Sequence, residues 1–232
     1  MGLFPEATPA VLFVWTAVAF ALMMTVFHHR RLAAKMPDDR AYHRYFLLFF
    51  ALFMAVPALI IVMGSAEPAR FLSAAGFSPG KWRLGLALAG IGVPICLIAA
   101  LVGSRDPSMQ AQYPFSKRAC ASAGKLAAFE TSYVLLYYLP WEFLFRGLLF
   151  FPLVPALGLV PALAVQAALS TLYHFGHPDT EVFAALGAGF AFGGIAFATG
   201  SIFYSFFLHA LVGVSTDVFL YLRRARRPAG HA

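Results

Sequence analysis

Long apolar segments alternate with short polar ones along the whole chain of 232 residues. A helix needs about 20 consecutive apolar residues to cross a lipid bilayer, and eight segments come close to this length. We therefore predict eight candidate membrane helices, over residues 9–27, 45–64, 84–103, 121–139, 141–157, 159–175, 182–199 and 201–222. Pro140 is expected to break the chain between the fourth and fifth candidates, because proline removes a helix hydrogen bond and clashes with the preceding turn.

Basic residues predict which side of the membrane the connections face. The linker 28–44 and the tail that begins at Arg223 are both rich in arginine and lysine, so both are expected in the cytoplasm. Seven candidate helices lie between them, and an odd number of crossings cannot return the chain to the same side.

Two interpretations resolve this conflict. The segment 121–139 is the weakest candidate because it contains Lys125 and Glu130, of which Glu130 is expected to be structural or interfacial. If this segment is interfacial or re-entrant, the N-terminus lies outside, and Glu142 and His174 lie near the cytoplasmic face. The alternative is eight full spans with both termini on one side.

Composition places the chain among membrane proteins. Hydrophobic residues make up 61% of it and charged residues only 12%, whereas soluble domains contain about 25% charged residues. We predict an all-α fold, a polytopic membrane helix bundle of seven or eight transmembrane helices with an intramembrane polar cavity. The net charge of +7 does not indicate nucleic-acid binding, because the basic residues lie beside apolar segments, as cytoplasmic flanks do.

Ionisable side chains inside the apolar segments are the candidates for function, because such residues are costly in a membrane and usually face a cavity or a partner. All of them lie in the second half of the chain: Glu130, Glu142, Arg146, His174, His209 and Asp217. Glu142 and Arg146 are four residues apart and share one helix face. They form either a structural ion pair or a carboxylate that the guanidinium holds in its charged form.

Two histidines extend this candidate site. His209 lies deep in the last apolar segment, where a buried polar group is costly unless it has a partner. His174 ends an apolar segment, where a histidine is often only an interfacial residue. Together with Glu142 they predict a site at which three helices converge. In this hypothesis Glu142 is a general base that draws a proton from water, and the histidines orient that water or stabilise an oxyanion.

Other polar residues nearby have competing interpretations. In the loop FGHPDTE, we expect His177, Asp179 and Glu181 to be solvated or to cap the next helix. The alternative is that this loop borders the entrance for a substrate. Asp217 follows His209 by two helical turns, and it either orients a histidine or pairs with a basic group.

Small residues predict close helix packing between the two histidine-bearing segments. Gly189 and Gly193 form a GxxxG pattern, which permits close approach of membrane helices. We expect this pattern to serve packing within the molecule rather than dimerisation, because small residues at this place would draw the histidine helices together.

Three short motifs in this order, WEFLFR, STLYH and HALVG, resemble those of the CAAX protease and bacteriocin-processing family of glutamic intramembrane endopeptidases. The resemblance covers about residues 121–222. It implies that Glu142, Arg146, His174 and His209 are catalytic, that activated water attacks a scissile peptide carbonyl, and that neither a cofactor nor a metal is required.

The motifs also depart from the family pattern at three positions. Trp141 takes the place of a first glutamate, Ser170 that of a phenylalanine, and Gly213 that of an asparagine or aspartate after His209. Either Glu142 takes over as the base or the protein is catalytically impaired. A WEFxFRG-like first motif is similar to that of bacterial myxosortases, which cleave C-terminal membrane-anchored sorting tails, and this similarity favours activity.

The resemblance implies a multi-pass protein of a bacterial inner membrane, surrounded by lipids, with three parts. Residues 1–118 are expected to form anchoring helices and basic loops, 119–222 the catalytic core, and 223–232 a basic tail. The expected partner is a protein or peptide substrate with a C-terminal or leader membrane segment.

Two other functions are compatible with the same residues. One is a metal-dependent hydrolase in which His174, His209 and Glu142 or His177 bind zinc, since such side chains suit this ion. The other is a non-enzymatic scaffold, immunity or permease-like protein that uses the polar cluster for packing or for binding a partner.

Overall fold

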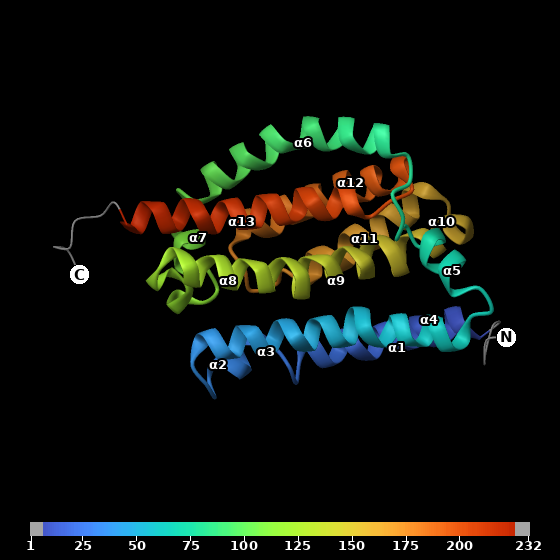
Figure 1. Cartoon of the computed structure of the whole chain (residues 1–232), viewed down its shortest axis with the longest axis horizontal. Coiled ribbons are helices and arrows are strands. Elements are labelled where there is room, and N and C mark those ends of the chain that lie inside the picture. Colours follow the sequence, from blue (N-terminus) through green and yellow to red (C-terminus); the bar gives the residue numbers. More distant parts are fainter. Residues whose placement is uncertain (1–6, 226–232) are drawn as a thin grey trace.

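The computed structural model describes residues 7–225, and every regular element within them is helical (Figure 1). In chain order the elements are α1 (Thr8–Met24), α2 (His29–Ala33), α3 (Asp38–Phe50), η1 (Ala51–Ala55), α4 (Val56–Gly64), α5 (Pro68–Ala74), α6 (Trp82–Gly103), α7 (Pro107–Gln112), η2 (Lys117–Ala121), α8 (Ala123–Tyr133), η3 (Val134–Tyr138), α9 (Leu139–Glu142), η4 (Phe143–Phe150), α10 (Phe151–Leu157), α11 (Leu159–Leu172), α12 (Asp179–Thr199) and α13 (Phe203–Ala225).

Five of the described helices are long and apolar enough to cross a membrane. They are Asp38–Gly64, Trp82–Gly103, Ala123–Leu157, Asp179–Thr199 and Phe203–Arg224. The helices α1 and α11 are apolar but shorter. This arrangement confirms the predicted all-α helix bundle, and the chain is an integral membrane protein that crosses the bilayer several times.

The expected break at Pro140 is wrong, because Ala123–Leu157 is one continuous helix of 35 residues. The segment 121–139 is therefore not a separate interfacial or re-entrant element. Pro140 is accommodated because the turn before it, η3, is a wider π turn, and Pro140 is the second residue of the α turn that follows. Near the start of an α-helical segment, the missing N–H of proline has the smallest effect.

The same combination occurs at two other prolines. Pro57 follows the π segment η1, and Pro152 follows the π segment η4, each as the second residue of the next α turn. Three π segments thus allow three prolines inside two long membrane helices. At each of these prolines the helix changes locally from π to α geometry, and the chain continues without a break.

One continuous helix in place of two candidates removes the conflict over topology. Six helical segments, the five long ones and the shorter α11, now connect the linker 28–44 with the end of α13, so both basic segments lie at the same end of the bundle. Figure 1 shows this end at the left, with the end of α13, and the opposite end at the right, with α5 and α10. The predicted tail beyond residue 225 lies outside the described residues.

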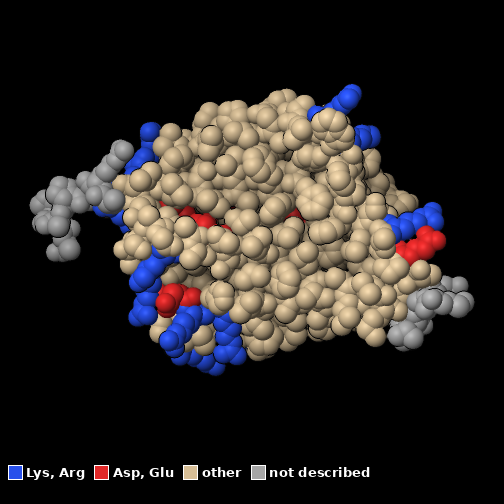
Figure 2. Space-filling model, in the orientation of Figure 1, with Lys and Arg blue, Asp and Glu red and all other residues tan. Residues whose placement is uncertain are grey.

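Charge is concentrated toward the ends of the bundle, and the long face in view between them carries few charges (Figure 2). The basic residues of the α2–α3 region, of the connection between α6 and α8, and of the end of α13 share one end: Arg30, Arg31, Lys35, Arg40, Arg44, Arg105, Lys117, Arg118, Lys125, Arg223 and Arg224. The opposite end carries Arg70, Lys81 and Arg83 among the described residues. The positive-inside rule assigns the more basic end to the cytoplasm.

An aromatic core joins the two halves of the chain. The ring of Phe49 on α3 stacks on Trp141 of α9, with 6.0 Å between centroids and 6° between planes. Tyr137 and Tyr173 also contact Trp141, and the hydroxyl of Tyr45 donates to that of Tyr173 at 3.4 Å. The first helices therefore form one wall of the region in which the predicted site residues lie.

Glycines let α12 pack closely on α11, as predicted for the GxxxG pattern. A Cβ on Gly189 would lie 3.0 Å from Cα of Ala167, and one on Gly193 would lie 2.6 Å from Nε2 of Gln166. The buried Gln166 amide donates to the carbonyl of Gly189 at 2.7 Å. This close packing fixes the start of α12 against the end of α11, where His174 lies.

Candidate functional site

The carboxylate of Glu142 is the deepest group of the site. Its Oε1 lies 2.8 Å from Nδ1 of His209 and 3.3 Å from Nη1 of Arg146. The side chain of Glu142 is 0% exposed and that of Arg146 is 2% exposed. A buried charge is tolerated when it is paired, so the i, i+4 spacing and the imidazole together explain how Glu142 can lie within an apolar helix.

The pairing also determines how His209 is protonated at one nitrogen. A carboxylate beside a guanidinium is ionised and can only accept hydrogen bonds. Nδ1 of His209 therefore carries the ring proton and donates a hydrogen bond to Glu142. The other nitrogen, Nε2, is left for another partner. Tyr138 holds the ring on one side, with 4.7 Å between centroids.

His174 follows the end of α11 and is held by the backbone of that helix. Its Nδ1 lies 2.9 Å from the carbonyl oxygen of Ser170. Because a carbonyl only accepts, Nδ1 carries the proton, and Nε2 of a neutral ring is an acceptor. This contact is made by the backbone carbonyl, so it does not depend on which side chain stands at position 170.

Trp141 brings the two histidines together. Its ring lies 5.1 Å from that of His174 and 5.7 Å from that of His209, measured between centroids, and both imidazoles stand edge-on to the indole. The structure thus brings together the carboxylate and both imidazoles that the sequence predicts to converge. The tryptophan at the first-glutamate position is a buried support for both rings.

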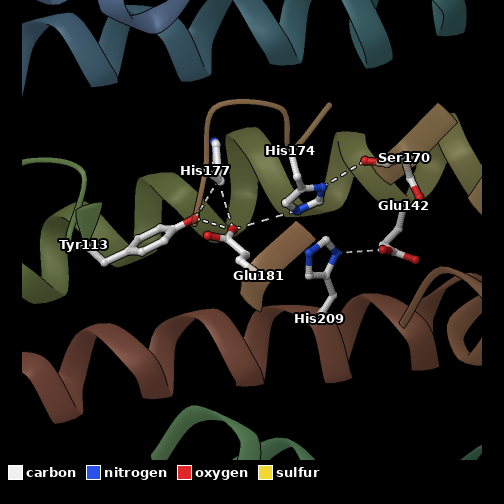
Figure 3. Close-up of polar contacts among 7 residues, drawn as sticks. All are labelled: Tyr113, Glu142, Ser170, His174, His177, Glu181 and His209. Atoms are coloured by element: carbon white, nitrogen blue, oxygen red, sulfur yellow. Dashed lines mark hydrogen bonds and ion pairs between the residues drawn. The ribbon is translucent and has the colours of Figure 1, made fainter. Parts of the chain in front are cut away.

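A second carboxylate faces His174 from the start of α12. Oε1 of Glu181 accepts from the hydroxyl of Tyr113 at 2.5 Å, and it lies 3.0 Å from Nδ1 of His177 and 4.0 Å from Nε2 of His174. Figure 3 shows the two imidazoles of His174 and His209 between the carboxylates of Glu181 and Glu142. The site is therefore two Glu–His pairs that face each other.

The sequence did not predict Tyr113 as a site residue. It lies in the connection between two long helices and contributes a hydrogen bond to Glu181. It lies after α7, outside the membrane-spanning segments, and burial together with the charge of Glu181 raises the pKa of its hydroxyl well above the usual value. The hydroxyl therefore stays protonated and donates to Glu181. No sequence signal marks this contact, because 68 residues separate the two positions.

The basic linker also reaches this region. Arg30 donates from Nη2 to the carbonyl oxygen of Gly176 at 2.6 Å and so fastens the loop between His174 and His177. Gly176 has a φ of 88°, in the left-handed region that favours glycine. The linker thus positions the loop that presents the histidines.

The remaining predicted residues lie outside the two Glu–His pairs. Asp217 is buried beside Glu130, and the charges of Lys117 and Arg224 act on its carboxylate. Both of its predicted roles, orienting a histidine and pairing with a basic group, stay predictions. Asp179 is exposed at the start of α12 and makes no side-chain cap, because the capping position is Pro178. Of the two alternatives predicted for Asp179, the structure agrees with exposure to solvent and not with capping.

Three side chains of the two Glu–His pairs are partly exposed at the surface of the bundle. The side chains of His174 and His209 are each 16% exposed and that of Glu181 is 17% exposed, whereas Glu142 is closed. A cavity of about 590 Å³ lies instead between α3 and α8 at the basic end, and its lining contains no predicted site residue. Within the described residues, no three His, Cys, Asp or Glu side chains are grouped so as to hold a metal ion.

Comparisons with known proteins add a family. No curated protein and no solved structure gives a significant match. Residues 126–215 match the family described as type II CAAX prenyl endopeptidase Rce1-like. The matched segment includes Glu142, Arg146, His174 and His209. The match confirms the predicted resemblance, and residues 126–215 carry the sequence pattern of the CAAX protease and bacteriocin-processing family.

Proposed function

We propose that this protein is an intramembrane endopeptidase that hydrolyses a peptide bond with an activated water molecule. The observation that carries the proposal is the pair of facing imidazoles on Trp141, each with a carboxylate beside it. Peptide hydrolysis needs a group that takes a proton from water and a group that stabilises the negative oxygen of the intermediate. Two adjacent Glu–His pairs supply both.

In this proposal His209 stabilises the oxyanion. Glu142 accepts from Nδ1–H, holds the ring in one orientation and balances its charge when Nε2 is also protonated. The protonated Nε2 then donates to the oxygen of the tetrahedral intermediate. Arg146 keeps Glu142 ionised, so Glu142 and Arg146 act as positioning residues.

His174 contacts the attacking water in the same scheme. Its Nδ1–H is fixed on Ser170, so Nε2 points toward Glu181 and can accept a hydrogen bond from that water. The two imidazoles then contact opposite sides of the reacting carbonyl group. No covalent intermediate with the enzyme is required.

The substrate in this proposal is a protein segment that lies in or at the membrane. The pairs lie among apolar helices, and the family name refers to peptides that end in a prenylated CAAX sequence. A C-terminal sorting tail with one apolar helix and basic residues is the alternative substrate class. The basic end of this bundle would repel such a tail, whereas the uncharged prenyl group fits an apolar bundle.

Comparison of protein termini in membranes tests the proposal. Cells with the native protein should contain one or more cleaved proteins that cells with the Glu142→Gln variant lack, because the amide no longer balances a protonated His209. We expect the cleavage rate to fall at least about 100-fold, as for removal of one oxyanion-stabilising group. Mass spectrometry of membrane-protein termini measures this difference.

A second variant and a control keep this test decisive. Glu142→Gln leaves Arg146 buried without a charged partner, so His209→Asn, at a partly exposed position, should be tested in parallel. The exposed Glu67→Gln should leave cleavage unchanged. If both site variants insert normally and no uncleaved protein accumulates, the protein is not a peptidase, and the scaffold hypothesis gains support.

A further inference from the structure

A water molecule that attacks a peptide needs a base at the open side of the site, and Glu142 does not reach that side. Its side chain is 0% exposed, its Oε1 contacts His209 and Arg146, and its Oε2 is buried without a hydrogen-bond partner among the described residues. Trp141 fills the place where the family motif has another carboxylate. The base in a working peptidase therefore has to come from elsewhere in the fold.

Glu181 has the arrangement that such a base requires. The hydroxyl of Tyr113 and Nδ1 of His177 hold its Oε1, at 2.5 Å and 3.0 Å. Its Oε2 has no hydrogen-bond partner among the described residues. The tyrosine and histidine thus hold the carboxylate in place with Oε1 toward His174, and the side chain is 17% exposed, whereas that of Glu142 is closed.

The gap between Glu181 and His174 is suited to a water molecule. Oε1 and Nε2 are 4.0 Å apart, which is too far for a direct hydrogen bond. With Nδ1–H donated to Ser170, Nε2 is an acceptor, and the carboxylate is also an acceptor. Two acceptors at this distance are bridged by a water that donates one hydrogen to each. Such a water keeps its lone pairs free for attack.

We infer that Glu181, at the start of α12, is the catalytic base that takes the proton from the attacking water in place of the missing first-motif carboxylate. This inference rests on the proposed function. The water oxygen forms a bond to the carbonyl carbon while one of its protons moves to Glu181. The bond between carbon and nitrogen then breaks, and the leaving amine receives that proton from Glu181, which returns to its carboxylate form.

A simple capping role does not account for this geometry. Acidic residues are common in the first turn of a helix because they interact favourably with its dipole. Asp179 lies in the same turn, but it is exposed and has no side-chain bond to a histidine or tyrosine among the described contacts. Glu181 alone is turned inward, onto His174, His177 and Tyr113.

The test is the kinetics of the purified full-length protein in lipid nanodiscs. The probe is a synthetic peptide that spans the cleavage site found by comparing native and Glu142→Gln cells. Glu181→Gln should lower kcat at least about 100-fold, the usual contribution of a general base, with KM changed only a few-fold. Asp179→Asn is the matched control and should leave kcat unchanged.

Chemical rescue separates catalysis from structure. In Glu181→Ala, added formate places a small carboxylate beside His174, and we expect kcat to recover in part. A residue needed only for packing would not be replaced by formate. Loss of activity without any recovery, in a variant that inserts and unfolds like the native protein, would assign Glu181 a structural role.

The outcomes distinguish this inference from the proposed function. Full activity of Glu181→Gln, together with an inactive Glu142→Gln, overturns the role of Glu181 and leaves the peptidase intact. A native protein that cleaves no membrane protein at all overturns both. Reduced kcat in Glu181→Gln with formate rescue of Glu181→Ala supports both.

Discussion

Gly213 illustrates how one residue changes the site. The family motif has asparagine or aspartate here, but a Cβ at this position would overlap the hydroxyl of Tyr138. The ring of Tyr138 lies against His209 instead, with 4.7 Å between centroids. The glycine thus makes room for a tyrosine ring that lies against the histidine.

Substitution of Gly213 tests this packing. Alanine in a helix is favoured over glycine by about 1 kcal/mol, but overpacking of a full site costs about 1–3 kcal/mol. We expect Gly213→Ala to lower the free energy of unfolding through its clash with Tyr138. Thermal unfolding in detergent measures the change.

A glycine with open space is the control for this change. A Cβ on Gly194, in α12, meets no other atom within 4 Å. Gly194→Ala should leave the melting temperature unchanged or raise it. Equal effects of the two substitutions would show that Tyr138 does not fill the space beside Gly213.

At the scale of elements, most of the bundle was predictable and the exceptions have physical causes. Apolar segments of membrane length predicted the spanning helices because lipid requires such segments. The prediction of a chain break at Pro140 was wrong. The effect of a proline depends on the turn before it, and a π turn has no clear sequence pattern. Glu142, His174 and His209 were predictable as polar groups in apolar segments. The contact from Tyr113 to Glu181 was not, because only the packing of distant segments creates it.

The close contact between α11 and α12 gives a prediction at this scale. A Cβ on Gly193 meets Gln166 and Leu163, so Gly193→Leu should push the two helices apart. The buried bond from Gln166 to Gly189 would be lost, and Glu181 would move away from His174. We expect about 1–3 kcal/mol of destabilisation and a marked loss of cleavage in a membrane assay.

Gly194→Leu is the matched control on the same helix, because its Cβ points to open space. It should retain cleavage and stability. If Gly193→Leu cleaves as well as Gly194→Leu does, the close approach of α11 and α12 is not needed for the site.

At the scale of the whole molecule, the six helical segments between the basic linker and the end of α13 predict the topology. Cysteine labelling tests it in a variant without Cys96 and Cys120. A single Ala34→Cys, beside α2, should be protected from an impermeant thiol reagent in intact bacterial cells, because the positive-inside rule predicts that the basic end faces the cytoplasm. Ala69→Cys, in α5 at the opposite end, should be labelled. The reverse pattern would invert the assignment of the two ends.

The stacking of Phe49 on Trp141 limits which segments of this protein can be exchanged with those of another protein. The segment that matches the family begins at residue 126, yet part of the wall around its histidines is built by a helix that ends long before it. The matched segment is therefore not independent of the first helices. A chimera that grafts residues 126–215 onto foreign anchor helices would retain every motif, Trp141 included, and lose the ring of Phe49 that stacks on Trp141.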